Sequence, residues 1–377
     1  MNNMLGVGQW HLGIRVGLLT ILVILSICCS SSEPTRIGFV GTTSGRVADL
    51  GVAGRNGAIL AVELRNQAGG VAGHQVELVV GDIKQESEIA ERVTRELIAQ
   101  GVIAIVGPMT SAMAIHMVPI TDEAKILLVS PTATTTDLSN RDDYFFRVVP
   151  SNREVAAKNA RYQLAQGLRR MAIVYDLANQ PYSESWLNNF RDVFVQGGGV
   201  LTQTLNFKSG SDTFLLPIAT EVLATQPDGV LIIAGSVDTA LLCQQIRKLD
   251  ARIPITTAEW GATKRLVELG GKAVEGVTAM QLFDPNDSTP AYQAFRQRYL
   301  SRFSHEPGFS GTAAFDATNV VLEALARRRP GQSLKEVIQA TRRFKGIQHP
   351  LEFDDYGDAN RAIFVTAVHD GQFVKVD

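Results

Sequence analysis

Cysteine is scarce in this sequence, which excludes one common way of stabilising a fold. Three cysteines occur in 377 residues, too few for a framework of disulfides. Cys28 and Cys29 are adjacent near the start of the chain. Cys243 lies in an apolar run predicted to be helical, where a thiol packs as a small hydrophobic side chain. We therefore expect the fold to be stabilised by ordinary hydrophobic cores.

An excess of charge is missing as well. The chain has 36 lysines and arginines against 38 aspartates and glutamates, a net charge of −2. Nucleic acid and anionic membrane surfaces are therefore excluded as main ligands. The hydrophobic share of 45% is typical of a soluble globular protein. A chain of this length is expected to divide into two lobes, each with its own core.

The patterns of an active site are absent too. No Ser or Cys stands near a His with the spacing of a nucleophile and its base, and metal ligands at useful spacing are missing. Gly6 and Gly8 precede an apolar segment instead of following a strand, so they form no dinucleotide fingerprint. We expect no enzyme, no metal site and no cofactor.

The first residues of the chain differ from the rest. Residues 16–27 form an apolar run too short to span a bilayer comfortably, so residues 1–32 are predicted to be a signal peptide and the protein to be exported. Cys28 and Cys29 precede a run of serines, a pattern that resembles the lipobox and tether of bacterial lipoproteins. Either cysteine is a candidate lipidation site. Cleavage near Ser32 and a retained anchor helix are the alternatives.

From residue 35 onward, short β-branched runs alternate with helical runs in two successive series. The first series of predicted strands covers residues 36–40, 74–80, 102–106, 126–129 and 144–149. The second covers residues 171–175, 200–207, 229–233 and 253–257. This alternation predicts an α/β protein with two mostly parallel sheets, joined by right-handed crossovers that place helices on both faces.

Two neighbouring strands of the first series each end in a loop rich in hydroxyl groups. Ser111 follows the strand at 102–106 and precedes an apolar helical run, so it is predicted to cap that helix. Residues 130–136 follow the next strand. Loops at the carboxyl ends of parallel strands line the ligand crevice of such sheets, and helix N-termini attract anions. The sequence therefore predicts an anion-holding rim here.

Several short segments, in their order and spacing, resemble the periplasmic branched-chain amino-acid-binding proteins of ABC transporters. The resemblance covers about residues 35–377. It rests on Ile37 to Gly45, Gly51, Gly57-Ala58, Asn66, Gly69 to Val71, Asp82, Ile105 to Gly107, Ser111, Ser130 to Thr134, Phe146-Arg147 and Ile173 to Asp176. It implies a type I periplasmic-binding fold, in which two α/β lobes, each a mostly parallel sheet flanked by helices, are joined by three hinge crossings.

The resemblance also implies where the lobes divide. The crossings are expected near Pro150, near residues 282–284 and near Pro350. The first lobe would contain residues 35–150 plus 285–350. The second would contain residues 151–282 plus 351–377.

The resemblance further implies a set of ligand-binding residues. Those matching Ser111, Thr132 and Thr134 hold the α-carboxylate and ammonium of an amino acid in this family. Glu259 would complete the ammonium site, and Tyr182 would close over the ligand. Plainer roles remain open for each: helix cap for Ser111, turn residues for the two threonines, a salt bridge to a hinge lysine for Glu259, and a helix-capping staple for Tyr182.

Three positions depart from the family pattern where the side-chain pocket is expected. Leu50 stands where relatives often carry an aromatic residue, Ser236 where some carry Tyr, and Arg46 where Pro is usual. Arg46 could contact the pocket or be solvated. The departures leave the preferred amino acid open.

The function implied is that of an extracytoplasmic solute-binding protein of an ABC importer, which binds an amino acid, branched-chain or related, by hinged closure. Its expected partners are that solute and an ABC permease in the inner membrane, and it is expected to be a monomer, periplasmic or lipid-anchored. A sensory receptor with the same fold, or a binder of an amide or small carboxylate, is the alternative.

Overall fold

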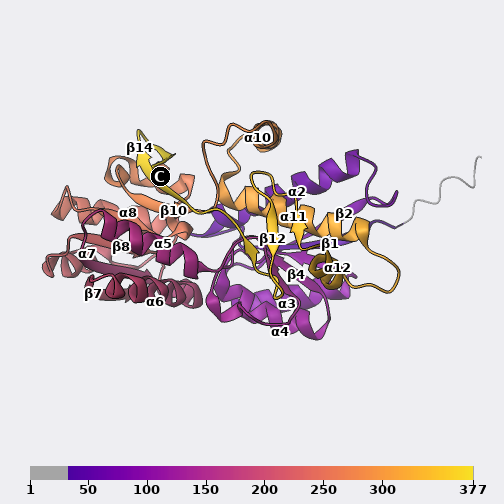
Figure 1. Ribbon diagram of the computed structural model, residues 1–377, viewed down its shortest axis with the longest axis horizontal. Helices are drawn as coiled ribbons and strands as arrows, with labels where there is room; N and C mark the ends of the chain where they lie inside the picture. Colours follow the sequence, from indigo (N-terminus) through magenta and orange to yellow (C-terminus); the bar gives the residue numbers. More distant parts are fainter. Residues whose placement is uncertain (1–32, 377) are drawn as a thin grey trace, which may run out of the picture. The chain divides into compact units, whose positions relative to one another are not determined.

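The computed structural model describes residues 33–376. The predicted signal peptide, with Cys28 and Cys29, lies outside the described residues. Within the described range, none of the helices combines the length and the apolar character that crossing a bilayer requires. Residues from Thr35 onward form a single compact unit, in which the elements of two large sheets separate into two lobes (Figure 1).

The first lobe is built on a five-stranded parallel sheet with the order β2-β1-β3-β4-β5. Its strands are β1 (Thr35–Gly41), β2 (Val76–Asp82), β3 (Ala104–Val106), β4 (Leu127–Ser130) and β5 (Phe145–Arg147), and its helices are α2 (Ala48–Gln67), α3 (Ser87–Ala99), α4 (Ser111–Glu123) and the short η1 (Thr136–Leu138). Every residue of β3, β4 and β5 is buried. Burial on both faces is what the apolar runs of a parallel sheet require.

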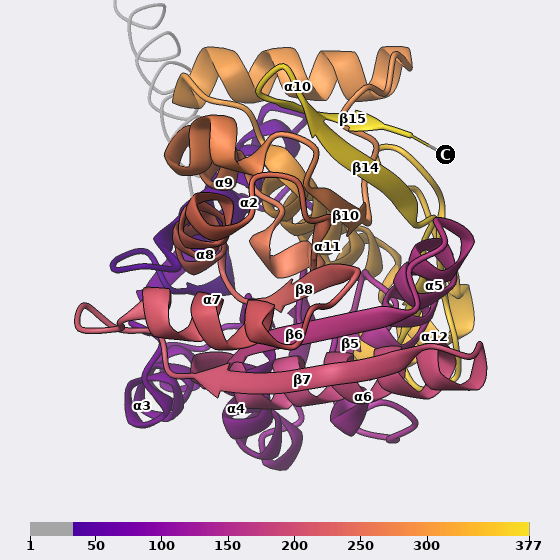
Figure 2. The same cartoon turned by 90° about the vertical axis from the view of Figure 1, so that its left-hand side faces the viewer.

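The second lobe contains a seven-stranded sheet with the order β15-β14-β10-β9-β8-β6-β7. Its strands are β6 (Arg170–Asp176), β7 (Val200–Phe207), β8 (Gly229–Ile233), β9 (Ile255–Thr257), β10 (Thr278–Gln281), β14 (Phe364–His369) and β15 (Gln372–Lys375). The neighbouring strands β7, β6, β8, β9 and β10 pair in parallel. Strand β14 pairs antiparallel with β10 on one side and with β15 on the other. The edge strand β7 runs beside β6 in Figure 2.

Helices cover this second sheet as the alternating pattern predicts. They are α5 (Asn152–Ala165), η2 (Leu177–Asn179), α6 (Gln180–Gln196), α7 (Leu215–Ala224), α8 (Ser236–Leu249), η3 (Glu259–Gly261), α9 (Lys264–Gly270) and η4 (Gly271–Val274). The two-lobed α/β architecture with mostly parallel sheets is therefore confirmed.

After β10 the chain returns to the first lobe, as the sequence suggests. The returning helices are α10 (Pro290–Phe303), α11 (Gly308–Arg327) and α12 (Leu334–Thr341). Helix α11 packs closely along α2. The two helices are so close that a Cβ atom added to Gly57 would lie 2.1 Å from the carbonyl oxygen of Gly311. Only a residue without a side chain permits that approach.

The third crossing is not at Pro350, where we expected it. Residues 351–360, assigned by sequence to the second lobe, form β12 (Leu351–Phe353) and β13 (Ala359–Asn360), which pair in a small sheet with β11 (Arg343–Phe344). Phe353 packs on Phe146 of the first lobe, with ring centroids 5.8 Å apart. The apolar face of this small sheet is thus buried against the first lobe, and the chain crosses only after Asn360.

Candidate functional site

The hydroxyl of Ser111 joins the two loops that follow β3 and β4. Its Oγ accepts hydrogen bonds from the backbone N–H groups of Thr134 and Thr135, both at 3.1 Å. Ser111 is 1% exposed. A hydroxyl that accepts twice still has one proton to donate. Ser111 therefore joins the two loops of the predicted rim and keeps one proton to donate, and the binding of an anion there stays a prediction.

The predicted capping role of Ser111 is wrong. Thr110 occupies the N-cap position of α4 in an extended conformation, with no side-chain cap bond, and Ser111 is already helical. The N–H of Ala112 is satisfied instead by the Oδ1 of Asn179, at 2.9 Å, which comes from the second lobe. A side chain distant in sequence has taken the place of a local cap.

The two threonines of the second loop differ in what their hydroxyls do. Thr132 donates to the carbonyl oxygen of Met109 at 2.6 Å and is half-buried. Thr134 is buried, and its Oγ1 lies 3.5 Å from the Oε1 of Glu259, across the gap between the lobes. Of the two, Thr134 faces the second lobe, whereas the hydroxyl of Thr132 is engaged within the first.

Glu259 is a buried carboxylate in η3, directly after the parallel strand β9. It is 4% exposed, and its Oε2 accepts a hydrogen bond from the indole Nε1 of Trp186 at 2.9 Å. Burial raises the pKa of the Glu259 carboxyl, although hydrogen bonds from its own backbone and from Trp186 oppose the rise. No salt bridge joins Glu259 to a cation in the part of the chain that the structure describes.

Tyr182 and Trp186 lie on the face of α6 that covers Glu259. The two residues are four positions apart, so they occupy the same side of the helix. Tyr182 packs edge-to-face on Trp260, with ring centroids 5.6 Å apart, and its hydroxyl accepts from the N–H of Trp260 at 3.4 Å. Burial, and then the charge of Glu259, raise the pKa of Tyr182 well above its ordinary value. Its phenol thus stays protonated.

Sequence reasoning missed Trp186 and Asn179. Both are buried, Trp186 completely. The four-residue spacing from Tyr182 was the available signal for Trp186. For Asn179 it was the position just after β6, at the carboxyl edge of the second sheet, where the first lobe also has its polar loops.

Two of the three predicted pocket positions, Leu50 and Ser236, lie near the starts of helices on opposite lobes. Leu50, near the start of α2, is buried in the hydrophobic core. Ser236, the first residue of α8, donates from Oγ to the Oδ2 of Asp49 at 2.8 Å. Ser236 therefore bonds across the lobes, to the residue that precedes Leu50.

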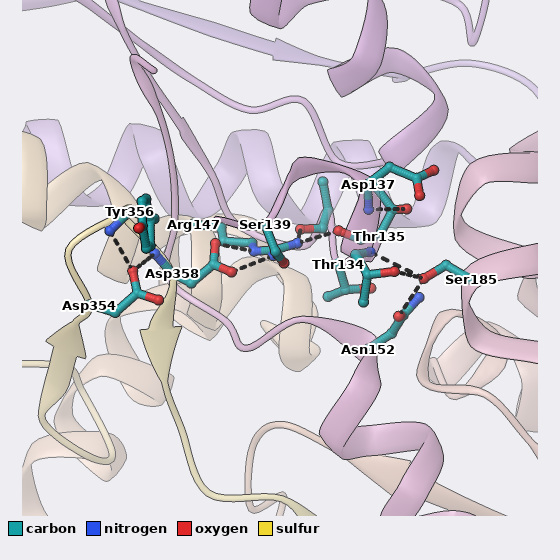
Figure 3. Close-up of polar contacts among 12 residues, drawn as sticks. Thr134, Thr135, Asp137, Ser139, Arg147, Asn152, Ser185, Asp354, Tyr356 and Asp358 are labelled. Atoms are coloured by element: carbon teal, nitrogen blue, oxygen red, sulfur yellow. Dashed lines mark hydrogen bonds and ion pairs between the residues drawn. The ribbon is translucent and has the colours of Figure 1, made fainter. Parts of the chain in front are cut away.

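A buried arginine fixes the loop that carries Thr134. Arg147, the last residue of β5, is fully buried. Its guanidinium donates to both carboxylate oxygens of Asp358, at 2.7 and 2.6 Å. It also donates to the carbonyl oxygen of Thr135 at 2.8 Å and to the hydroxyl of Ser139 at 2.5 Å. The next residue of the same loop, Thr136, donates from its N–H to the Oγ of Ser185, and Ser185 donates in turn to the Oδ1 of Asn152 (Figure 3).

One further group of possible ligands lies outside this site. Glu275, His369 and Asp370 each offer an atom within 4.8 Å of the others, but all three are exposed. Exposed groups of this kind are common without a metal ion.

The family model described as periplasmic binding protein matches residues 34–377. The Leu/Ile/Val-binding protein BraC3 of Rhizobium johnstonii is 26% identical over 342 residues, which cover 90% of this chain and 92% of that protein.

Solved structures show the same architecture. A leucine-binding protein from Thermotoga maritima has a TM-score of 0.83 and 26% identity, covering 91% of this chain and 98% of that one. A solute-binding protein of an ABC transporter from R. palustris, in complex with benzoate, has a TM-score of 0.82 at 18% identity, covering 91% and 96%. The second likeness concerns the fold alone.

Proposed function

Because this chain belongs to the periplasmic binding protein family, we propose that it captures an amino acid outside the cytoplasm and delivers it to an ABC permease. Members of this family bind solutes and catalyse no reaction. The observation that carries the proposal is the buried carboxylate of Glu259, which has no cationic partner among residues 33–376. A buried charge must be paired, and the ammonium group of an amino acid would supply the missing cation.

The residues of the first lobe that face Glu259 suit the α-carboxylate of the same amino acid. The proton of the Ser111 hydroxyl, at the start of α4, offers a neutral donor to an α-carboxylate. Thr134 contacts both sides of the site, because its N–H donates to Ser111 and its hydroxyl lies 3.5 Å from Glu259. An amino acid is a zwitterion, so a site with donors on the first lobe and one negative charge on the second complements both of its charged groups. We propose that the bound amino acid has a branched-chain or related side chain, because the relative BraC3 is named a Leu/Ile/Val-binding protein.

Closure is the proposed mechanism. The donors belong to the first lobe, whereas Glu259, Tyr182 and Trp186 belong to the second. A ligand therefore makes its full set of contacts only when the lobes are together. Contacts made in one conformation alone are what shift a population toward it.

Two alternatives remain distinct from this proposal. A binder of a plain carboxylate has a precedent in the benzoate complex of the same fold, but a carboxylate ligand would leave Glu259 unpaired and add a second negative charge. A sensory receptor would use the same closure to signal. Permease and ATPase genes beside this one would support transport, whereas a kinase gene would support sensing.

Identifying the solute tests the proposal directly. We expect mass spectrometry of protein purified from its exporting host to detect a bound amino acid. Calorimetry with a panel of amino acids should then rank that solute first, and small-angle scattering should show that it compacts the protein. A bound carboxylate that has no amine, or identical scattering with and without a saturating ligand, would contradict the proposal.

We also propose that the protein is anchored by lipid at Cys28 or Cys29. A single acyl chain binds membranes only weakly, and a lipoprotein carries more than one. Replacing both cysteines by Ser should move the protein from the membrane fraction to the soluble fraction, whereas Cys243→Ser, at a buried site, should not. Retention of the double variant in the membrane would point to an uncleaved helix or a membrane partner instead.

A further inference from the structure

A second set of contacts joins the lobes away from Glu259. Arg46, just after β1, donates from Nε to the Oγ of Ser209 at 3.2 Å and forms a salt bridge with Asp238 of α8. The hydroxyl of Ser209 donates in turn to the other oxygen of Asp238 at 2.5 Å. The side chain of Asp238 is 3% exposed, and that of Arg46 is 32% exposed. A charge of the first lobe thus neutralises a buried charge of the second.

Asp49, one turn further along, makes a separate connection. Its Oδ2 accepts from the hydroxyls of Ser236, at 2.8 Å, and Thr263, at 2.7 Å, both in the second lobe. Arg46 and Asp49 also line a hollow between the lobes, together with Val237 and Arg265. None of these bonds involves Ser111, Thr134, Tyr182 or Glu259.

We propose that these six residues, Arg46 and Asp49 with Ser209, Ser236, Asp238 and Thr263, form an interlobe clasp that sets the affinity of the protein without selecting its ligand. The bonds can form only when the lobes meet, so they belong to the free energy of closure. Apparent affinity falls in proportion to the closed, binding-competent population. The clasp therefore scales the affinity for every ligand by the same factor.

The surroundings of Asp238 add a cost to opening. Asp176, buried at the end of β6, accepts from the N–H of Ser209 at 2.9 Å and lies near Asp238. Burial raises the pKa of Asp176 to about 6, the charge of Asp238 adds to that rise, and Arg46 opposes it. When Arg46 withdraws, the second lobe keeps two neighbouring acidic groups without their cation.

The test replaces Arg46 by Met, with Arg55→Met as the matched control. Arg55 is a partly buried arginine on α2 that bonds to Asn56 of its own helix. With leucine and alanine as calorimetric probes, Arg46→Met should weaken both by about fivefold or more, with their affinity ratio unchanged, and Arg55→Met should weaken neither. Asp238→Asn in the Arg46→Met background should add little, because the two residues act as one pair.

A change in the leucine-to-alanine ratio would place Arg46 in the ligand pocket and overturn the proposal, as would an unchanged affinity for both probes. These titrations rest on the proposed function, because they require that the protein binds amino acids. Small-angle scattering of the ligand-free protein is the independent measurement, and it should show a larger radius of gyration for Arg46→Met than for wild type. If neither amino acid binds wild type, the proposed function fails, while equal radii overturn the clasp itself.

Discussion

The variant Glu259→Gln is expected to lose at least ~30-fold in amino-acid affinity. Removing one partner of a buried, hydrogen-bonded charge pair costs about 2–5 kcal/mol, and 2 kcal/mol corresponds to roughly 30-fold. The ammonium of the ligand would enter a closed site with no countercharge. Isothermal titration calorimetry at neutral pH measures the loss. Glu221→Gln, an exposed position on α7 of the same lobe, is the matched control and should bind as wild type does.

Stability separates this loss from misfolding. Burial raises the pKa of Glu259 above its ordinary value of about 4.5, so the folded protein disfavours the ionised form. Below the ordinary value both states are protonated, and the penalty is absent. As the pH rises through the raised pKa, the penalty becomes complete. Glu259→Gln should therefore be as stable as wild type in acid and more stable at neutral pH, without ligand.

The same pKa gives a pH dependence to binding. An ammonium group pairs only with the ionised carboxylate, so wild-type affinity should fall as the pH is lowered through the raised pKa of Glu259. The affinity that remains in Glu259→Gln should lack this dependence. A wild-type affinity that rises in acid would contradict the assigned role.

Replacing Arg147 by Met should reduce the unfolding free energy by about 3–5 kcal/mol, the usual result of breaking a buried ion pair. The substitution leaves the carboxylate of Asp358 and the carbonyl oxygen of Thr135 without their donor. Urea unfolding, followed by circular dichroism and tryptophan fluorescence, measures the change. Because Arg147 also fixes the loop that carries Thr134, ligand affinity should fall as well.

The hairpin that carries Asp358 offers a control for this prediction. Arg342 pairs with Asp355, and both side chains are more than half exposed. Exposed pairs contribute about 0–1 kcal/mol, so Arg342→Met should change the unfolding free energy by no more than that. If Arg147→Met and Arg342→Met reduced the unfolding free energy equally, the buried ion pair would stabilise the protein no more than an exposed one.

Periodicity and turn residues predicted most of the parallel framework, because most of its strands are short apolar runs and several border Gly or Pro, as β3 does before Gly107-Pro108 and β4 before Pro131. Strand β10 was not predicted, since Thr278–Gln281 has only four residues, of which Thr278 alone is β-branched, and it leads into a polar connector. Residues 351–360 of the small sheet were assigned to the second lobe, although they pair with β11 and pack on the first. Leu351 and Phe353 alternate as a strand should, but alternation does not say which core buries them.

The candidate site was only partly predictable for a similar reason. The pattern of strands and loops pointed to Ser111 and to the loop that carries Thr134, whereas Tyr182 and Glu259 came from the family resemblance, and the structure brings the four residues together. Their individual roles remain predictions. Contacts across the gap between lobes, such as Asn179 with Ala112 and Trp186 with Glu259, depend on how the lobes meet. The sequence around each residue does not predict that arrangement, so Asn179 and Trp186 were identified only in the folded structure.

The most direct test of the account compares an amino acid with its des-amino analogue, for leucine 4-methylpentanoate, by calorimetry on wild type and Glu259→Gln. The two ligands share a carboxylate and a side chain, and they differ only in the ammonium group. Wild type should bind the amino acid at least ~30-fold more tightly, and the difference should shrink in Glu259→Gln. Equal binding of the two by wild type would contradict the central claim and make Glu259 a structural residue.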